Sequence, residues 1–572
     1  MRKRHINSKP ILMTQPRERP LHATRCAFGL LILFMITCTS SADRPLASDP
    51  LGAFIEQTKD GERPSASLVA SFDGLGAGFE GPHGRFTGRN PSDNSLAVGP
   101  DHVVQTVNTR LAIFSKRGER YQTTGEVFYG PVPTNTVFHG FGGTCEARNN
   151  GDAVVRYDQL AQRWLIVMPI FRRGAERPDQ PGDWVASDAP YVSPPGVPGQ
   201  PGPAAPLFVP PAPSVDTQAA QPRNVASQPE PSGPYSMCYA VSTGPDPLGS
   251  YYRYEFLRPL FPDYPRPAVW PDGYYVPTST GDDVVQKHTC VVDRRAMLVG
   301  EPATEQCFVV DDVSFLNNVD LDGTTLPPAG AANIVMATGG TQLLGHYEDD
   351  GIYVWQFQVN WQDPDQSSLS GPQKIDVAPY RFLCDGQLTK CVRQPGTDQH
   401  LDAQGDKLMA RVVYRRLPDR ESIVAVHSVT TNAGAGGVRW YEFTVNDDRS
   451  VTLRQQGTYA PDQYYRWMAS PAIDRFGNIG IGYSFGGTPH FPGQRFAGRL
   501  ADDPPGVLTM REIELVTGEG AQTNTYRWED YTQTAIDPVD DCTIWYVGDY
   551  YGERAPSYST RVGAFQLPGC PT

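Results

Sequence analysis

Acidic, guanidinium and indole side chains recur in short segments that stand directly before apolar stretches of the chain. Sugar rings stack on indole faces, while Asp and Arg side chains bond sugar hydroxyls or carboxylates. Two carboxylates at a suitable separation also act as acid with base or nucleophile in glycoside cleavage. The candidates for ligand binding are Asp93, Asn94, Asp152, Arg266, Asp406, Arg466, Trp467, Arg527, Trp528 and Asp530.

A repeated hairpin pattern supplies the elements that would position these residues. An apolar pair, a turn of Asp, Gly, Asn or Pro, and an alternating apolar segment recur, with onsets near residues 95, 153, 267, 333, 407, 469 and 533. Turn signals throughout, about four short strands per unit and little helical periodicity predict an all-β fold, a β-propeller of about seven four-stranded blades. A pair of β-sandwich domains is the alternative, but sandwiches would not repeat one hairpin at this period.

In a propeller the innermost strand of every blade runs in the same direction along the central axis. Residues just before each first strand therefore converge on one rim of the channel, and the ten candidates are expected to share a polar channel mouth. In the alternative interpretation, each Asp caps a turn, while Arg and Trp close the channel by ion pairing and stacking. Retaining, inverting and non-catalytic sites stay open, because a sequence supplies no carboxylate separations.

The chain is predicted to contain a signal peptide at 1–42, an N-terminal linker at 43–69 and a single propeller body at 70–572. A basic lead, an apolar run at 26–38 and the small residues before position 43 predict export, with cleavage after Ala42. A lipid anchor at Cys38 is the less favoured alternative, and no later membrane span is expected. Residues 172–234 are rich in Pro, Gly, Ala, Ser and Gln, and we interpret them as a disordered insertion inside one blade.

The charge balance of the chain is acidic. Its 572 residues include 49 Lys and Arg against 63 Asp and Glu, a formal net charge of −14, and removal of residues 1–42 changes this to −20. Nucleic-acid binding needs a basic footprint and is therefore disfavoured, as are anionic membranes. We expect an extracellular or periplasmic protein whose partner is a glycan or a cell-surface protein.

Eight cysteines follow the signal peptide, and an even number outside the reducing cytosol predicts four disulfides. Three pairs are close in sequence, and the fourth follows by elimination: Cys290/Cys307, Cys384/Cys391, Cys542/Cys570 and Cys145/Cys238. The alternative, a metal site of Cys384, Cys391 and His400, matches no zinc spacing well.

One segment, 318–323, begins like a calcium loop. Asp320 and Asp322 alternate with apolar residues before Gly323, but Ala329 stands where the closing bidentate Glu belongs. A calcium ion here would be structural, and an ordinary Asx-type turn is the alternative. No other cofactor is expected.

Several motifs carry a family resemblance: Ala97–Asn108, Gly151–Asp158, Asp263–Tyr275, Asp320–Gly323, Arg466–Met468, Arg527–Tyr531 and Asp537–Cys542. With them, the chain from about 70 to 570, apart from the insertion, resembles a widespread family of exported, functionally uncharacterised bacterial β-propeller-like proteins. The resemblance implies a secreted propeller-like body and supplies no catalytic residue. The chain departs from the family pattern at Glu529, where Gly is expected, and in the insertion.

Together these features predict a secreted β-propeller whose channel mouth binds an extracellular glycan. If the protein is an enzyme, a glycoside hydrolase or a polysaccharide lyase is expected. The alternative is a non-catalytic propeller that acts as a protein-binding or surface-adhesion module, with residues 172–234 as a tether or partner contact.

Overall fold

The computed structural model describes residues 52–88, 90–171, 235–258, 262–278, 287–386 and 390–571. The predicted signal peptide, Cys38 and the insertion at 172–234 lie outside the described residues. The helical elements in the described part are short: α1 (Gly143–Ala147), α2 (Arg294–Val299), and the 3₁₀ turns η1 (Gly52–Ile55), η2 (Thr134–Phe138), η3 (Pro364–Gln366) and η4 (Leu383–Asp385). Strands form the rest of the regular structure, which confirms the all-β prediction. None of the helices in these ranges is long and apolar enough to cross a membrane.

There are five separate four-stranded antiparallel sheets, and in four of them every strand pairs with its neighbours in sequence. The first contains β5 (Asn94–Val98), β6 (His102–Val107), β7 (Arg110–Ser115) and β8 (Val127–Pro133). The second contains β9 (Val154–Asp158), β10 (Arg163–Ile170), β11 (Tyr235–Ser242) and β12 (Tyr251–Arg258). The third contains β13 (Ala268–Trp270), β14 (Gly273–Thr278), β15 (Lys287–Val292) and β16 (Glu305–Val310). Another contains β27 (Tyr465–Ile473), β28 (Ile479–Gly487), β29 (His490–Arg499) and β30 (Ile513–Val516). The last contains β31 (Gln533–Ile536), β32 (Ile544–Tyr550), β33 (Ser559–Gln566) and β2 (Ser67–Asp73).

Two further four-stranded sets are joined into one nine-stranded sheet by parallel pairing of β17 with β23. One set contains β17 (Asn317–Leu321), β18 (Asn333–Thr338), β19 (Ile352–Gln358) and β20 (Ser368–Ile375). The other contains β23 (Val412–Arg416), β24 (Glu421–Thr430), β25 (Gly436–Val445) and β26 (Val451–Tyr459), with β1 (Glu56–Gln57) on its outer edge. Two short hairpins complete the strands, β3 (Glu80–Gly81) with β4 (Gly84–Arg85) and β21 (Lys390–Val392) with β22 (Leu401–Asp402).

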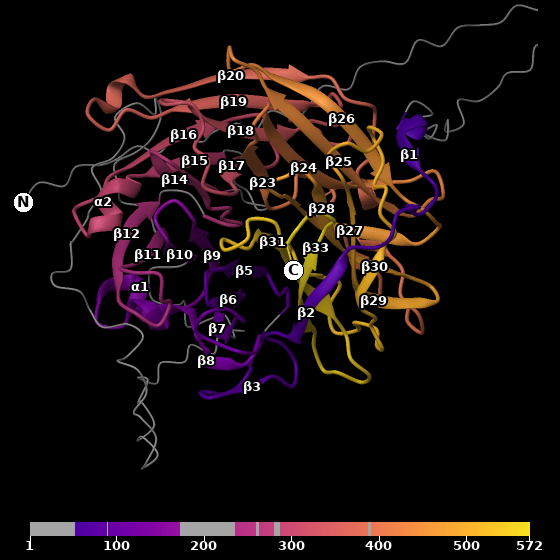
Figure 1. The fold of residues 1–572 in the computed structure, drawn as a ribbon, viewed down its shortest axis with the longest axis horizontal. Coiled ribbons are helices and arrows are strands. Elements are labelled where there is room, and N and C mark those ends of the chain that lie inside the picture. Colours follow the sequence, from indigo (N-terminus) through magenta and orange to yellow (C-terminus); the bar gives the residue numbers. More distant parts are fainter. Residues whose placement is uncertain are drawn as a thin grey trace, which may run out of the picture. The chain divides into compact units, whose positions relative to one another are not determined.

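The first strands of these seven sets contact one another in a closed series. The successive contacts are β5 with β9, β9 with β13, β13 with β17, β17 with β23, β23 with β27, β27 with β31, and β31 with β5. Figure 1 shows β5, β9, β23 and β31 towards the middle of this arrangement, and β8, β12, β20 and β26 towards the outside. The residues just before the first strands are therefore brought towards a common end of the series.

Most of the expected hairpin onsets fall at or beside these first strands, but two differ. The onset near residue 333 is wrong as a first strand, because Asn333 begins β18. The first strand of that set is β17, whose polar sequence, from Asn317 to Leu321, lacks the apolar pair of the repeat. The onset near residue 407 lies in the loop before β23. Strand β2 begins at Ser67, within the range assigned to the linker.

Neighbouring sheets pack face to face, and glycines in β28 permit the close approach. A Cβ atom at Gly480 would lie 2.4 Å from the Phe496 ring, and one at Gly482 would lie 2.3 Å from the ring of Tyr546. Tyr546 belongs to β32, so the alternating Ile and Gly residues of β28 leave room for an aromatic side chain of the next sheet. Glycine in a strand interior commonly marks such close packing.

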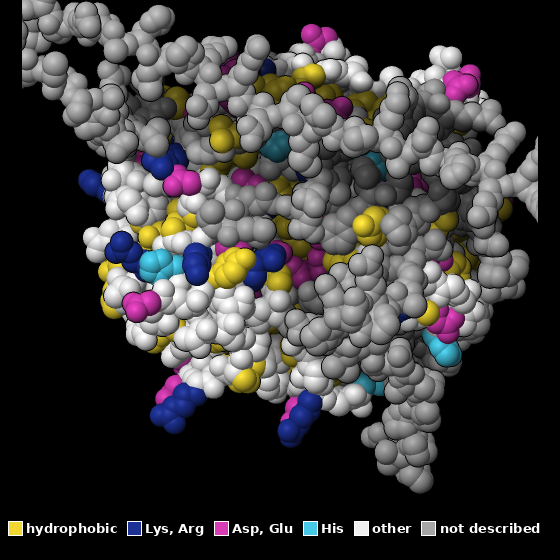
Figure 2. Space-filling model, turned by 180° about the vertical axis from the view of Figure 1, so that it is seen from behind, with side chains coloured by type: hydrophobic (Ala, Val, Ile, Leu, Met, Phe, Trp, Pro, Cys, Tyr) yellow, Lys and Arg dark blue, Asp and Glu magenta, His cyan; other side chains and the backbone are white. Residues whose placement is uncertain are grey.

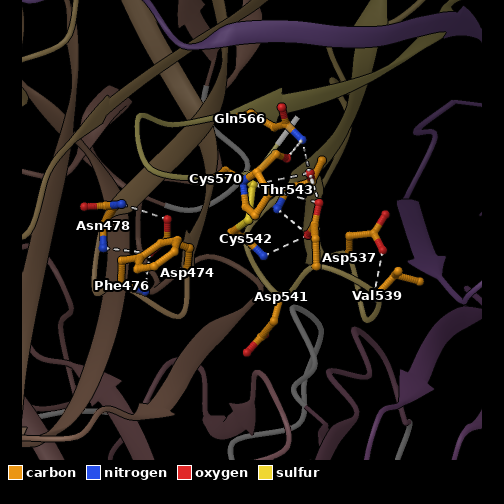
Figure 3. Close-up of a disulfide and its surroundings, with 12 residues drawn as sticks. Asp474, Phe476, Asn478, Asp537, Val539, Asp541, Cys542, Thr543, Gln566 and Cys570 are labelled. Carbon is orange, nitrogen blue, oxygen red and sulfur yellow. Dashed lines mark hydrogen bonds between the residues drawn. A yellow bond between two sulfur atoms is a disulfide. The ribbon is translucent and has the colours of Figure 1, made fainter.

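The structure forms the four disulfides expected from the cysteine spacing: Cys145–Cys238, Cys290–Cys307, Cys384–Cys391 and Cys542–Cys570. Figure 3 shows the last of them beside the turn that precedes β32. Thr543 Oγ1 donates to Asp540 Oδ2 at 2.5 Å and accepts a hydrogen bond from Gln566 Nε2 at 3.0 Å. The disulfide and these hydrogen bonds link the start of β32 to the end of β33. Disulfides are typical of proteins that fold in an oxidising compartment.

We predict that the Cys542→Ser/Cys570→Ser variant unfolds more easily than the native protein. The disulfide closes a loop with a sequence separation of 28 residues, and loss of a bond of this kind costs about 2–4 kcal/mol, largely through the greater entropy of the unfolded chain. The Cys384→Ser/Cys391→Ser variant is the control, because its bond spans a separation of 7 residues. Calorimetric unfolding without reductant measures both losses. A 542/570 variant as stable as the native protein would contradict the prediction.

Candidate functional site

Loops that lead into the first strands bring acidic and basic side chains together at one end of the series. Asp93 directly precedes β5, Asp152 stands before β9, and Asp530 stands before β31. Their charges act on one another and on a wider group that we call the loop cluster: Asp93, Asp152, Asp263, Arg266, Asp402, Gln404, Asp406, Lys407, Arg527 and Asp530. Six sequence candidates belong to it, namely Asp93, Asp152, Arg266, Asp406, Arg527 and Asp530.

Asp93 and Asp152 form a carboxyl pair within the loop cluster. Asn108 Nδ2 donates to Asp93 Oδ2 at 2.5 Å and to Asp152 Oδ1 at 3.3 Å, so one amide group links the two side chains. Burial, with the charges of Asp152 and Asp530, raises the pKa of Asp93 well above its ordinary value. Burial, with the charges of Asp263 and Asp530, raises the pKa of Asp152 to about 8. The pair therefore retains protons at neutral pH.

Arg527 lies between two other carboxylates of the cluster. It forms an ion pair with Asp530, and its Nε lies 3.3 Å from Asp402 Oδ2. Gln404 Nε2 donates to Asp530 Oδ1 at 3.0 Å, and the backbone N–H of Trp528 donates to Asp402 Oδ1 at 2.9 Å. Burial, with the charge of Asp530, raises the pKa of Asp402 to about 8. This part of the cluster is held by hydrogen bonds from several directions.

The other basic groups lie against aromatic rings. The Arg266 guanidinium lies 4.4 Å from the centre of the Tyr264 ring, and the Lys407 ammonium lies 3.8 Å from the centre of the Phe315 ring. Lys407 Nζ is also 3.3 Å from Asp406 Oδ1. Burial lowers the pKa of Arg266 to about 10. Cation–π contacts partly offset the removal of these charges from water.

Several residues around the cluster have a left-handed backbone. Positive φ angles occur at Asp93 (50°), Tyr264 (52°), Gln404 (45°), Glu529 (57°) and Asp530 (67°), none of which is glycine. Such conformations are unfavourable for residues with a Cβ atom and persist where the surrounding structure enforces them. Their concentration beside the carboxyl groups is typical of a site whose side chains are held in set directions.

Arg466 is not part of the loop cluster, contrary to the sequence prediction. It lies inside β27 rather than before it, and its guanidinium binds both Asp462 oxygens at 2.8 Å and Glu512 Oε1 at 2.7 Å. Tyr483 donates to the same Glu512 oxygen at 2.6 Å. Arg466 is fully buried, so this network has a structural role.

The two candidate indoles and Asn94 are also fully buried. Trp467 and Trp528 are fully buried with ring centres 6.1 Å apart, and Trp528 Nε1 donates to Ser484 Oγ at 2.9 Å. Neither ring face is open to a sugar, so the prediction of indole stacking is wrong for this structure. Asn94 is buried in β5 and donates to Asp549 Oδ1 at 2.5 Å.

Glu529 fixes the turn that carries Arg527 and Asp530. Its Oε2 accepts a hydrogen bond from Ser484 Oγ at 2.7 Å, and its Oε1 accepts from Gln494 Nε2 at 2.9 Å and from the Asp549 N–H at 2.5 Å. Burial, with the charge of Asp549, raises the pKa of Glu529 well above its ordinary value. The sequence drew attention to Glu529 as a departure from the family pattern but did not indicate its buried partners.

Asp320 and Asp322 belong to a second buried network among the first strands. Arg411 binds Asp322 and lies 2.8 Å from Asp320 Oδ2, while Arg156 Nε lies 3.2 Å from the same Asp320 oxygen. These side chains line a cavity of about 30 Å³, which is room for roughly two water molecules. A calcium ion would compete with two guanidinium groups for these carboxylates. The calcium interpretation stays a prediction that the pairing does not support.

Within the described residues, two groups of side chains lie close enough together to hold a metal ion, and both include disulfide sulfurs. They are Cys290, Glu305 and Cys307, and Asp540, Cys542 and Cys570. Sulfurs joined in a disulfide are not thiolate ligands. The alternative metal site at Cys384, Cys391 and His400 is wrong, because its two sulfurs form a disulfide.

Acidic side chains are also visible at the molecular surface. Figure 2 shows several of them beside Lys or Arg side chains near the middle of the face opposite to that of Figure 1. In the loop cluster, Asp152 and Asp263 are half-buried and Arg527 keeps 28% of its side chain exposed. These three are the members of the loop cluster that are not fully buried.

Comparisons with known proteins give distant structural likenesses. No protein-family model matches the chain, and no curated protein matches it. A protein of unknown function from Dyadobacter fermentans is 11% identical, with 88% of this chain and 100% of that chain covered and a TM-score of 0.32. The NanB sialidase from Streptococcus pneumoniae is 9% identical, with 74% and 68% covered and a TM-score of 0.36. The intramolecular trans-sialidase from Ruminococcus gnavus is 10% identical, with 72% and 92% covered and a TM-score of 0.34. At these scores the likenesses carry no argument about function.

We predict that the folded protein is less stable at pH 8.5 than at pH 5.5. In the unfolded chain Asp ionises near pH 4, whereas in the folded protein the pKa of Asp152 is about 8 and that of Asp93 is also raised. Between these values the folded state binds more protons than the unfolded state, so stability falls as pH rises. Melting temperatures from pH 5 to 9 test this.

The control for the pH prediction is the Asp93→Asn/Asp152→Asn variant, whose amides do not ionise. Its melting temperature is expected to fall less steeply over the same range. An unchanged slope would show that the two carboxyl groups are not the source of the dependence.

We also predict that Arg466→Ala destabilises the protein by about 3–5 kcal/mol, because it removes the buried cation between Asp462 and Glu512 and leaves Arg495 as the remaining partner of Glu512. Arg475→Ala, at an exposed position in the next turn, serves as the control. Denaturant unfolding measures both. Native-like stability of the Arg466 variant would refute the structural role of this ion pair.

Proposed function

We propose that the seven four-stranded sets form a seven-bladed β-propeller. The closed series of contacts from β5 through β31 and back to β5 supports this architecture. So does the pairing of β2 with β33, because propellers commonly complete their last blade with a strand from the other end of the chain. In this arrangement the loop cluster lies at one mouth of the central channel.

We further propose that the loop cluster binds an extracellular glycan. The observation that carries the proposal is the carboxyl pair of Asp93 and Asp152, held next to Asp530 and Arg527 by loops from both ends of the chain. Carboxyl groups that retain protons donate hydrogen bonds, while carboxylates accept them and Arg527 donates. A polyhydroxylated ligand matches this mixture, because every hydroxyl group both donates and accepts.

The spacing of the pair disfavours an inverting mechanism at these two residues. Glycosidases keep their two carboxyl groups about 5–5.5 Å apart when they retain configuration and about 6.5–9.5 Å apart when they invert it. Because Asp93 Oδ2 and Asp152 Oδ1 both accept from the same Asn108 nitrogen, these two oxygens lie closer together than the inverting separation. We therefore propose a binding role for Asp93 and Asp152.

The proposal predicts that the mature protein binds oligosaccharides and that Asp152→Asn and Asp530→Asn each weaken binding. The loss is expected to be about tenfold, because Asp530→Asn removes charge-assisted hydrogen bonds and Asp152→Asn replaces a carboxyl O–H donor with a weaker amide donor. Calorimetric titration against a panel of neutral, amino and acidic oligosaccharides measures the affinities, and chromatography of the incubated mixtures detects any products.

Asp447→Asn is the matched control, because Asp447 is an exposed residue in the turn between β25 and β26. It should bind like the native protein. If no oligosaccharide binds to the folded native protein, the glycan proposal is wrong. Cleavage that is lost in the folded Asp152 variant would contradict the purely binding role.

A further inference from the structure

Acidic groups outnumber basic groups in the loop cluster. Six carboxyl groups belong to it, those of Asp93, Asp152, Asp263, Asp402, Asp406 and Asp530, against the basic side chains of Arg266, Lys407 and Arg527 and the neighbouring Lys287. If all ionised, the group would be negative. The chain as a whole is also acidic, with a formal charge of −14. Local and overall charge therefore both favour a positive ligand.

The basic groups are directed at carboxylates other than the central pair. Arg527 is ion-paired with Asp530 and Asp402, and Lys407 with Asp406. Within the described part of the chain, neither Asp93 nor Asp152 has an ion-pair partner. Burial and the neighbouring carboxylates raise the pKa of both acids by more than the charge of Arg527 lowers it.

Two buried polar atoms next to the pair also lack a hydrogen-bond partner among the described residues. They are Oδ1 of Asp93 and the hydroxyl of Tyr531, whose side chains are in residues 1% and 2% exposed. The charges of Asp93, Asp152 and Asp530 all act on the Tyr531 hydroxyl, and the Tyr264 ring packs edge-on against the Tyr531 ring with centres 5.0 Å apart. A buried acceptor and a buried hydroxyl left open at one place indicate a position that a ligand group completes.

We infer that the group that binds beside Asp93, Asp152 and Tyr531 is the ammonium of an amino sugar. An ammonium has three donors and can reach both carboxyl groups and the phenolic oxygen, and its charge replaces the missing cation. This inference rests on the proposed glycan binding and names the class of sugar.

Other ligand charges fit the same position less well. A uronate or sialate carboxylate would add a negative charge to a group that already has excess acid. A divalent cation needs several carboxylate oxygens close together, and the described residues of the loop cluster contain no such group of three. An N-acetylated sugar has no charge and leaves the pair uncompensated.

The protonation of the pair depends on the groups around it. Asp93 faces Asn108, Asp152, Asp530 and Arg527, and Asp152 faces Asp93, Asp263, Asp530 and Arg527. An ammonium stabilises the carboxylate form and lowers the pKa of both acids. Because the ammonium and the carboxylates attract one another by charge, the preference for a charged sugar should weaken as the salt concentration rises.

The test uses three tetrasaccharides of equal length, built from glucosamine, N-acetylglucosamine or galacturonate, titrated calorimetrically into the mature protein at pH 6.5. The glucosamine tetramer is expected to bind about tenfold more tightly than the N-acetylated one, since a charge-assisted pair is exchanged for a neutral contact. The galacturonate tetramer should bind most weakly.

The Asp93→Asn/Asp152→Asn variant should bind the glucosamine and N-acetylglucosamine tetramers with similar affinity. The Asp447→Asn control should keep the native preference for the glucosamine tetramer. If the double variant does not fold, Asp152→Asn alone, at the half-buried edge, provides the same comparison. The inference is overturned, and glycan binding is left intact, if the N-acetylated or acidic tetramer binds more tightly than the glucosamine tetramer. The same holds if the preference for glucosamine survives in a folded variant at Asp93 and Asp152 or at Asp152 alone. Binding of none of the three overturns both.

Discussion

The pairing of β2 with β33 is the constraint on which the rest of the structure depends. It places Ser67 opposite Gln566 and Asp73 opposite Arg561, so a strand near the start of the described chain completes the last sheet. The first strand of that sheet, β31, contacts β5 of the first sheet. The loop cluster spans that same junction, because the N–H of Asp93 donates to the carbonyl of Glu529 at 2.8 Å. The closure therefore brings the turn of Arg527 and Asp530 beside the carboxyl pair, whose two members come from the first and second sets.

Burial sets the protonation of the carboxyl groups in the loop cluster, and the backbone conformation sets the directions of their side chains. Carboxyl groups removed from water and placed beside one another resist ionisation, which converts acceptors into donors. The left-handed residues Asp93, Glu529 and Asp530 turn the chain just before β5 and β31. Hydrogen bonds from Ser484 and Gln494 to Glu529 hold this strained turn in place. A glycine at position 529 would adopt the conformation more easily but would lose these contacts.

Sequence reasoning reached the features that depend on local spacing or on a simple repeat. Three disulfides join cysteines that are near one another in sequence, which leaves one partner for Cys145. Asp93, Asp152 and Asp530 precede first strands, so convergence followed from the repeat. Asp402 and Gln404 were missed because they lie in and after the β21–β22 hairpin, which has no place in the repeat. The failure of Arg466 has a similar cause. Its buried partner Glu512 lies beyond two strands, at a separation that carries no sequence signal.

The two polar networks differ in the balance of their charges. Among the first strands, Asp320 and Asp322 face Arg411 and Arg156, and every carboxylate has a guanidinium partner. Such balance stabilises a buried arrangement and leaves no charge for a ligand to compensate. In the loop cluster the acids exceed the bases, and Asp93, Asp152 and Asp402 have raised pKa values. If the cluster binds an ammonium group as we propose, the unequal charge count, more than the number of acids, distinguishes it from the structural network.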